Sequence, residues 1–302
     1  MDYLGIDVGG TQVKWARITD DYRIERQGNI ATDFSSPSQV IVALAKLVAS
    51  EGEGCAAVAV SFPGTIAPDD TSGTIVGGGA LTYMDGYPLA DELSQRCNIP
   101  VVVDNDGKSC ALGEYVRGAL RGCSVGSVIV IGTGLGGATV VDGKVFRGAH
   151  GNAGEISFMC ADIARGFAWS NIAAMGGGWT GLRNAICTEK GIEPSDDIDG
   201  IKLFEWVNGG DAAAQRGLAT YARLIAGLAH SLQTVLDCDV IAVGGGISAQ
   251  PALLDAIRAA QEESYRELNL PQFTPPRIVP AELGNDANLV GVVYETRRRL
   301  AI

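Results

Sequence analysis

Three short glycine-rich segments of the 302-residue chain have the residue types that bind phosphate groups. The first is Asp7-Val8-Gly9-Gly10-Thr11, the second covers 132–137 and the third covers 244–246. Glycine lets successive backbone N–H groups face one anion and has no Cβ to collide with phosphate oxygens. A single such turn is as often only a tight hairpin. Three of them, at corresponding places in the two halves of the chain, favour phosphate binding.

Polar side chains in and beside these turns extend the prediction. Asp7 is suited to hold Mg²⁺ through water, because magnesium favours hard oxygen ligands. Thr11 and Thr133 carry hydroxyl donors. The predicted phosphate- and nucleotide-binding residues are Asp7, Gly9, Gly10, Thr11, Lys14, Gly132, Thr133, Gly134, Gly136, Gly137, Gly244, Gly245 and Gly246.

Apolar runs on either side of the turns predict strands that position them. Residues 3–8 and 12–18 are expected to form a hairpin around Gly9-Gly10, with a third strand near 22–30. Two buried strands follow, at 56–61 before Pro63-Gly64 and at 101–103 before Asn105-Asp106. The second half repeats this order, with strands predicted at 127–131, 138–141, 144–146, 240–243 and 277–279.

Helices are predicted where apolar residues recur at helical spacing. The first covers 37–50 with Ser36 as its N-cap, and another opens at Asn105-Asp106 and runs to about Val116. Later helices are expected at 212–236, at 251–263 and from about 287. Two similar halves of this kind predict duplicated α/β domains with a cleft between them. Neither the Rossmann nor the P-loop glycine fingerprint occurs in the sequence.

Composition excludes several classes of protein. Glycine accounts for 41 of 302 residues, about twice its usual share, without any G-x-y period. The net charge of −12 lacks the broad basic footprint of a nucleic-acid binder. Seven cysteines without a C-x-C or C-x-x-C pair predict reduced thiols in the cytoplasm. No secretory leader is expected, and the uncharged stretch 123–141 is interpreted as a buried hairpin rather than a membrane helix.

Several motifs together resemble the ROK family of sugar kinases, within the actin/hexokinase-like ATPase superfamily. They are DVGGT with Lys14, Asn105-Asp106 opening a helix, IGTGLGG, Gly154-Glu155 and VGGGI, in family order over essentially the whole chain. The resemblance implies two actin-like (ribonuclease H-like) α/β domains. The first is expected at 1–118, completed by a helix at about 286–302, and the second, larger one at 119–285. It also implies ATP and Mg²⁺ as cofactors, with adenosine near the third glycine turn.

The resemblance assigns roles to individual residues. Asp106 is expected to act as the general base, because a sugar hydroxyl is a weak nucleophile whose proton a carboxylate must accept. Asn105 and Glu155 match positions that hydrogen-bond sugar hydroxyls, and Gly64 matches a turn that walls the sugar. The predicted substrate-binding residues are Asn105, Glu155, Gly64, Gly79 and Phe158.

The sequence departs from the family after Glu155. Most members continue with a histidine and a cysteine cluster that binds zinc, whereas here Phe158 takes the histidine position and Cys160 is the only cysteine nearby. We therefore expect no zinc site, because phenylalanine cannot ligate a metal. Trp169 stands near an expected glutamate, and the pattern is similar to the β-glucoside kinase branch, which accepts disaccharides. Alternatively, Phe158 and Trp169 are core residues of a rebuilt loop.

These observations lead to one main functional expectation and its alternatives. The main one is an ATP-dependent kinase that phosphorylates the 6-hydroxyl of glucose or of a glucose-containing sugar; a β-glucoside kinase is the alternative within that class. A sugar-responsive regulator of the same family would carry an N-terminal helix-turn-helix, whereas the first strand is expected here from Tyr3. An actin- or chaperone-like ATPase is disfavoured by the sugar-site residues. The family also implies a homodimer. The acidic charge disfavours nucleic acid as a partner, and no membrane partner is expected.

Overall fold

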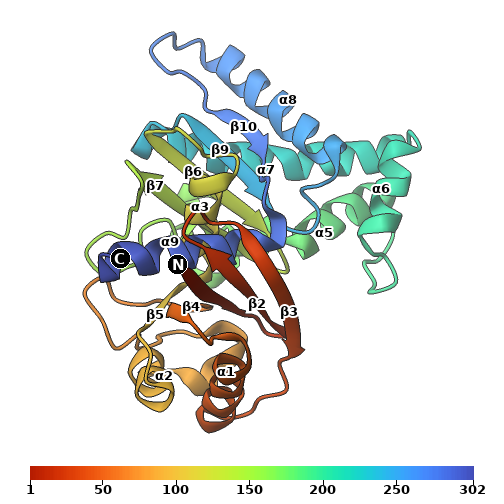
Figure 1. Ribbon diagram of the computed structural model, residues 1–302. Helices are drawn as coiled ribbons and strands as arrows, with labels where there is room; N and C mark the ends of the chain where they lie inside the picture. The colour runs from red at the N-terminus through yellow and green to blue at the C-terminus, as the bar shows by residue number, and fades with distance from the viewer. The chain divides into compact units, whose positions relative to one another are not determined.

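The computed structural model describes residues 1–302, apart from the side chain of Ala80. It divides into two units, the first formed by Met1–Gly122, Gly143–Gly154 and Leu283–Ile302, and the second by Cys123–Asp142 and Glu155–Glu282. The strands make two five-stranded sheets, in the orders β3-β2-β1-β4-β5 and β10-β9-β6-β7-β8 (Figure 1). The expected α/β fold is confirmed.

The first unit is built from twelve elements along the chain. They are β1 (Asp2–Val8), β2 (Gln12–Thr19), β3 (Ile24–Ala31), α1 (Pro37–Glu51), β4 (Cys55–Phe62), the 3-10 helix η1 (Gly79–Met84), α2 (Leu89–Cys97), β5 (Val101–Asn105), α3 (Asp106–Arg117), β8 (Lys144–Val145), η5 (Gly284–Asp286) and α9 (Ala287–Leu300).

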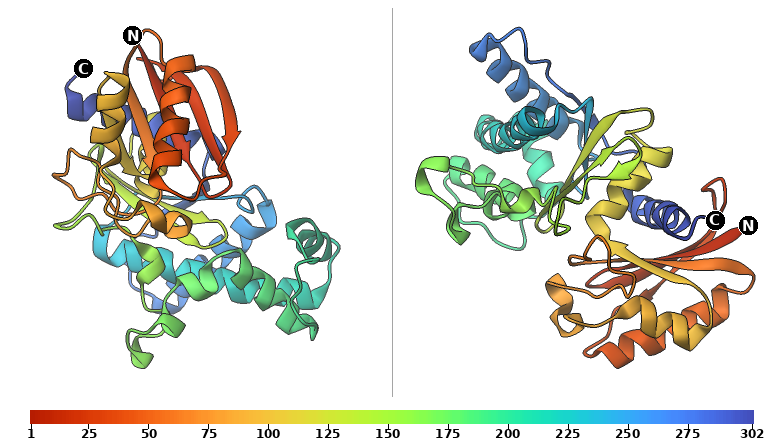
Figure 2. Two further views of the ribbon diagram at one scale, coloured as in Figure 1. Left: turned by 90° about the horizontal axis from the view of Figure 1, so that it is seen from below. Right: turned by 90° about the vertical axis from the view of Figure 1, so that its left-hand side faces the viewer.

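The sheet of the first unit combines a hairpin with parallel strands. Strands β1, β2 and β3 pair antiparallel, and β1, β4 and β5 pair parallel. Helices α1 and α2 cover one face, and α9 packs its apolar side on the other (Figures 1 and 2). Burying both faces explains why β4 and β5 are continuous apolar runs rather than alternating ones.

Helices α3 and α9 of this unit pack backbone against backbone. A Cβ placed on Gly113 would lie 2.1 Å from the carbonyl oxygen of Ala287, and one on Gly291 would lie 1.8 Å from that of Ser109. Only glycine fits at these two positions. The C-terminal helix is thereby held against the helix that Asp106 opens, although the two are far apart in sequence.

The second unit contains the other twelve elements. They are β6 (Val125–Ile131), β7 (Leu135–Val141), η2 (Ile156–Phe158), η3 (Ile163–Arg165), η4 (Trp169–Asn171), α4 (Ala174–Gly177), α5 (Trp179–Lys190), α6 (Gly200–Asn208), α7 (Ala212–Leu236), β9 (Val240–Gly244), α8 (Pro251–Leu268) and β10 (Arg277–Pro280). Its core joins buried residues of β6, β9 and β10 to those of α5, α6, α7 and α8.

Several sequence predictions need correction. Residue 36 does precede α1, but its side chain makes no capping hydrogen bond and lies 3.1 Å from the hydroxyl of Ser38 instead. Helix α8 extends to Leu268, beyond the predicted 263. Helices α2, α5 and α6 are absent from the predicted elements, and in the first two polar residues obscure the apolar spacing. The predicted hairpin at 123–141 is confirmed as β6 and β7.

Among the described residues, we find no helix with the length and apolar character needed to cross a membrane.

Ion pairs explain why the structure places 143–154 in the first unit, whereas the predicted second domain included it. The Arg147 guanidinium donates to both carboxylate oxygens of Asp104, at 2.8 and 2.6 Å, and to Oε1 of Glu295 at 3.0 Å. The Tyr294 hydroxyl also donates to the carbonyl of Gly143. The chain therefore returns to the first unit between β7 and Glu155.

Glu295 is the buried carboxylate at the centre of this cluster. Burial by itself raises its pKa, but hydrogen bonds from Arg298 and Arg299 and the charge of Arg147 outweigh burial and lower the pKa from 4.5 to about 2. Because the pKa is lower in the folded chain than in the unfolded one, ionised Glu295 stabilises the fold at pH values above about 4.5. That stabilisation is lost as the pH falls toward about 2.

We expect Glu295→Gln to remove most of this pH dependence. The lowered pKa corresponds to about 3 kcal/mol above pH 5, of which about 1 kcal/mol should remain at pH 3. Denaturant unfolding from pH 3 to 7 measures the difference between wild type and variant. The exposed control Glu53→Gln should follow the wild-type curve, and a Glu295→Gln curve parallel to wild type would contradict the assignment.

Candidate active site

The first sheet brings predicted site residues together at one edge. In the parallel register, Asp7 at the end of β1 is paired with Ser61 of β4, and Ser61 is paired with Asp104 of β5. Asn105 and Asp106 follow directly. Because parallel strands end on the same side of a sheet, the predicted magnesium ligand and the predicted base lie along a single edge.

Asp7 is buried, with 8% of its surface exposed, and its Oδ1 is held by two donors. The Ser61 hydroxyl donates to it at 2.8 Å and the Asn288 amide at 3.0 Å. Among the described residues, Oδ2 of Asp7 accepts no hydrogen bond. One fixed carboxylate with an available oxygen suits Mg²⁺, which usually takes few protein ligands and completes its shell with water and phosphate. The described residues contain no group of three or more His, Cys, Asp or Glu side chains able to hold a metal by themselves.

Thr32 stabilises the first glycine turn with two hydrogen bonds. The Thr32 hydroxyl donates to the carbonyl of Gly9 at 2.9 Å, and its N–H donates to that of Thr11 at 3.1 Å. Gly10 and Thr11 remain exposed. Lys14 donates to Oδ1 of Asn285 at 3.0 Å, so a residue near the C-terminus orients its amine.

Asn105 is the N-cap of α3 and connects three parts of the site. Its Oδ1 accepts from the N–H of Lys108 at 2.9 Å, while its Nδ2 donates to the carbonyl of Gly64 at 2.8 Å and to Oδ1 of Asp106 at 3.0 Å. Both amide hydrogens are therefore used within the protein. One lone pair of Oδ1 remains for a ligand hydroxyl.

Asp106 lies half-buried at the first position of α3. Its Oδ1 accepts from the Asn105 side chain and, at 2.8 Å, from the N–H of Gly107. Both hydrogen bonds meet the same carboxylate oxygen at the N-terminus of α3, so the position of the Asp106 side chain is fixed by its two neighbours in the chain.

Gly64 and Gly79 border the same place. Gly64 adopts a φ of +109°, and a Cβ there would lie 3.0 Å from the carbonyl oxygen of Val76. Gly79 adopts a φ of +61°, with Pro63 the nearest neighbour to its missing Cβ at 3.9 Å. The Pro63-Gly64 turn and the 77–79 turn are therefore neighbours beside Asn105.

In the second unit, two glycine turns meet at one sheet edge. Val130 of β6 is paired with Gly244 of β9, and a Cβ on Gly245 would lie only 2.0 Å from the carbonyl oxygen of Ile131. The turns at 132–134 and 244–246 are thus adjacent. The structure assigns Gly136 and Gly137 to strand β7 rather than to the turn, which corrects the predicted start of that strand at 138.

The space around the missing Cβ shows which glycines of the second and third turns are required by packing. A Cβ on Gly137 would lie 2.8 Å from the Ile156 side chain, and Gly245 has a φ of +100° besides its contact with Ile131. Packing accounts for these two. In the described structure, a Cβ on Gly134 or Gly246 would meet no atom within 4 Å. Packing does not explain glycine at these two positions.

The start of α5 supports the second turn, although no residue of this segment was predicted to belong to the site. The N–H of Trp179 donates to the carbonyl of Gly132 at 2.9 Å, and a Cβ on Gly178 would lie 2.6 Å from the carbonyl oxygen of Thr133. The start of α5 therefore packs on this turn. The glycine run at 176–178 was the available signal.

Glu155 is half-buried and directly precedes the loop that departs from the family pattern. The Phe158 and Trp169 side chains are 48% and 76% exposed, with ring centroids 6.2 Å apart in an edge-on arrangement. Neither ring is in the core, so the core interpretation is wrong. The buried side chain of Asn171 donates to the carbonyls of Asp162 and Gly166 and so orders this loop.

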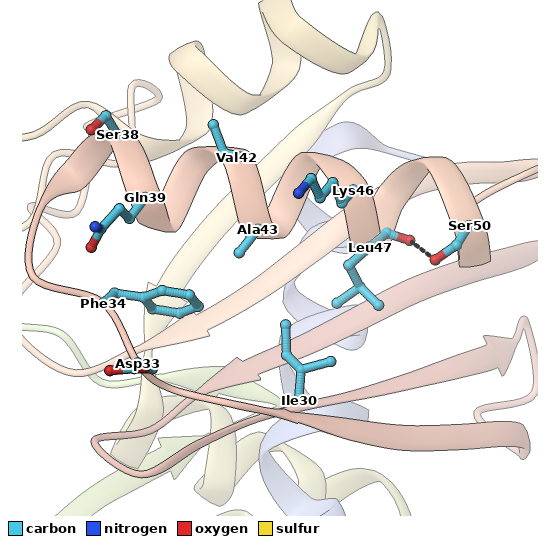
Figure 3. Close-up of a pocket in the computed structure, with 10 residues that line it drawn as sticks. All are labelled: Ile30, Asp33, Phe34, Ser38, Gln39, Val42, Ala43, Lys46, Leu47 and Ser50. Atoms are coloured by element: carbon cyan, nitrogen blue, oxygen red, sulfur yellow. Dashed lines mark hydrogen bonds between the residues drawn. The ribbon is translucent and has the colours of Figure 1, made fainter.

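A groove of about 740 Å³ between α1 and β3 lies apart from these residues (Figure 3). Ile30, Phe34, Val42 and Leu47 contribute most of its apolar lining, with Lys46 along the helix. It includes no predicted site residue. The groove follows from the way α1 covers the edge strand and does not mark the chemistry.

Comparison with known proteins identifies the family. The sequence matches the ROK family over residues 3–298. The chain belongs to the ROK family. This match covers both units and all the motifs described above.

Individual ROK relatives are named as kinases of different sugars. The chain is 30% identical to the glucokinase of Halalkalibacterium halodurans over 314 aligned positions, covering 96% of this chain and 93% of that protein. It is 28% identical to the beta-glucoside kinase of Klebsiella pneumoniae over 302 positions, covering 97% and 95%. The solved ROK glucokinase of Streptomyces griseus, in complex with glucose and AMPPNP, superposes with a TM-score of 0.80 at 26% identity, covering 99% and 100%.

Two neighbouring glycines test the distinction between packing and ligand approach. We expect Gly245→Ala to destabilise the second unit by about 1–3 kcal/mol, because its Cβ would meet the Ile131 backbone. The matched control Gly246→Ala should unfold within about 0.5 kcal/mol of wild type. Thermal and denaturant unfolding measure both, and equal stability of the two variants would contradict the packing argument.

Proposed function

We propose that this ROK protein is an ATP-dependent sugar kinase that transfers the γ-phosphoryl group to the 6-hydroxyl of glucose or of a glucose-containing sugar. The observation that carries the proposal is the environment of Asp106. Its carboxylate accepts hydrogen bonds from the Asn105 side chain and the Gly107 N–H at the start of α3, and it lies on the same sheet edge as Asp7. It is arranged to accept the hydroxyl proton as the new bond to phosphorus forms.

The glycine turns support the choice of ATP. Exposed N–H groups in the first turn, together with the open glycines Gly134 and Gly246 of the second unit, suit phosphate oxygens. Asp7 would hold Mg²⁺ through water, and Thr11, Thr133 and Lys14 would contribute hydroxyl donors and a charge. When bound, Mg²⁺ neutralises charge on the phosphates. A ROK relative of known structure was solved with an ATP analogue.

Sugar recognition is proposed for Asn105, Gly64, Gly79 and Glu155. Asn105 offers one acceptor lone pair, Gly64 forms the turn that accepts from its amide, and Gly79 leaves space beside that turn. Glu155 supplies a carboxylate for hydroxyl groups. Glucose is the proposed acceptor because the relatives include glucokinases and one solved with glucose.

We expect Asp106→Asn to lower kcat by about 10²–10⁴-fold, the usual contribution of a general base. Sugar binding should persist, because the asparagine oxygen can still accept from the N–H of Gly107. A coupled ADP-release assay measures turnover and calorimetry measures binding. The matched control is Asp91→Asn, an exposed aspartate in the first turn of α2. Asp106→Asn with more than about a tenth of wild-type kcat would refute the role.

A β-glucoside kinase is the second candidate, favoured by the exposed Phe158–Trp169 pair that follows Glu155. Aromatic faces stack on the apolar faces of sugar rings, and this pair offers such surface where most family members have polar residues. The Klebsiella pneumoniae relative is named for that activity.

A panel of glucose, fructose, mannose, N-acetylmannosamine and cellobiose distinguishes the candidates. For a β-glucoside kinase, we expect Trp169→Ala to raise KM for cellobiose roughly three- to tenfold and to leave glucose unchanged. Phe167→Ala, which removes an equally exposed ring outside the pair, is the control. If the protein phosphorylates monosaccharides but not cellobiose, it is not a β-glucoside kinase. Sugar binding without any turnover would point to a regulator.

A further inference from the structure

The Arg147 guanidinium is enclosed by two buried carboxylates of the first unit. Asp104 and Glu295 are each fully buried, and the Arg147 side chain is 10% exposed. The two nitrogens that end the guanidinium pair with separate oxygens of Asp104, and one of them also donates to Glu295. This fork geometry fixes both the position and the plane of the Asp104 carboxylate.

Asp104 connects the ion pair with Arg147 to the residues that follow it in the chain. Its Oδ1 accepts from the N–H of Asn105 at 2.8 Å as well as from Arg147. The peptide that leads from the strand into α3 is therefore tied to the ion pair. Asn105 then holds Oδ1 of Asp106 through its own side chain.

We propose that Arg147 is a positioning residue for Asp106, acting through Asp104 and Asn105. The inference rests on the proposed function, in which Asp106 accepts the proton of the sugar hydroxyl. The hydrogen bonds of the Arg147 guanidinium go to Asp104 and Glu295, and its side chain is only 10% exposed. Arg147 holds the carboxylate that orients the turn from which the base projects.

The surroundings explain why arginine is required. Arg298 and Arg299 both donate to the Glu295 carboxylate with hydrogen bonds of 2.8 Å, so Glu295 on the far side of Arg147 keeps the Arg299 donor when Arg298 is removed. Lysine carries a single point charge and cannot bridge both oxygens of Asp104 in one plane. Removing the guanidinium leaves Asp104 buried and without its main counter-charge.

The position of Arg147 in the chain adds a second consequence. It lies on the segment 143–154, whose last residue directly precedes Glu155. The same ion pair that orients Asp106 therefore anchors the segment leading to a predicted sugar-binding residue. Loss of Arg147 should disturb the geometry of the reaction more than nucleotide binding.

The kinetic test compares Arg147→Ala, Arg147→Lys and Arg298→Ala. We expect Arg147→Ala to lower kcat roughly 10- to 100-fold with KM for ATP within about twofold, as misplacement of a catalytic group does. Arg147→Lys should recover part of kcat. Arg298→Ala, which loses hydrogen bonds to Glu295 but none to Asp104, should retain kcat within about twofold. Equal loss of kcat in Arg147→Ala and Arg298→Ala would overturn the proposal.

Amide hydrogen exchange tests the positioning role of Arg147 independently of the proposed kinase activity, because the measurement needs no turnover. In Arg147→Ala, the amides of Asn105, Gly107 and Lys108 should exchange faster than in wild type, while in Arg298→Ala they should not. Unchanged exchange at these amides would overturn the positioning role, whether or not the protein phosphorylates sugars. Absence of turnover by wild type with the expected exchange pattern would refute the kinase assignment alone.

Discussion

Parallel pairing of β1, β4 and β5 is the constraint on which the candidate site depends. Hydrogen bonding between these strands fixes Asp7 beside Ser61 and Ser61 beside Asp104, with Asn105 and Asp106 next along the chain. Asp7 and Asp104, about a hundred positions apart, thus come to one edge through backbone pairing, and the Ser61 hydroxyl between them donates to Asp7. The proposed phosphoryl transfer then depends on which residues lie at the ends of these strands. A slip of one position would turn every side chain of the strand to the other face.

Glycine serves two different purposes in this chain, and the structure tells them apart. Gly113 and Gly291 allow α3 and α9 to touch through their backbones, and Gly245 allows β9 to pass against β6. These glycines stabilise the fold. Gly134 and Gly246 have open space where a Cβ would be, so packing does not account for glycine at these positions. Their proposed purpose is the close approach of phosphate oxygens.

The charged cluster around Arg147 shows how the C-terminal helix α9 completes the first unit. Burying Asp104 and Glu295 is costly by itself, and it is offset because three arginines surround the two carboxylates. Two of these arginines and Glu295 belong to α9. The C-terminal helix therefore supplies both apolar cover for the sheet and the charges that hold the turn before α3.

The family, the α/β class and the places of the three glycine turns could be predicted from sequence alone, although Gly136 and Gly137 lie in β7 rather than in the second turn. Prediction was possible because these signals are local: a strand, a turn and a helix start lie within about ten residues, and the motifs keep their order. Only the tertiary structure showed that Asn288 and Asn285 orient Asp7 and Lys14, that Arg147 holds Asp104, and that packing explains Gly137 and Gly245. It also moved 143–154 into the first unit and brought Phe158 and Trp169 to the surface. Such contacts join residues far apart in the chain, and their partners are selected by burial and register, which no local pattern encodes.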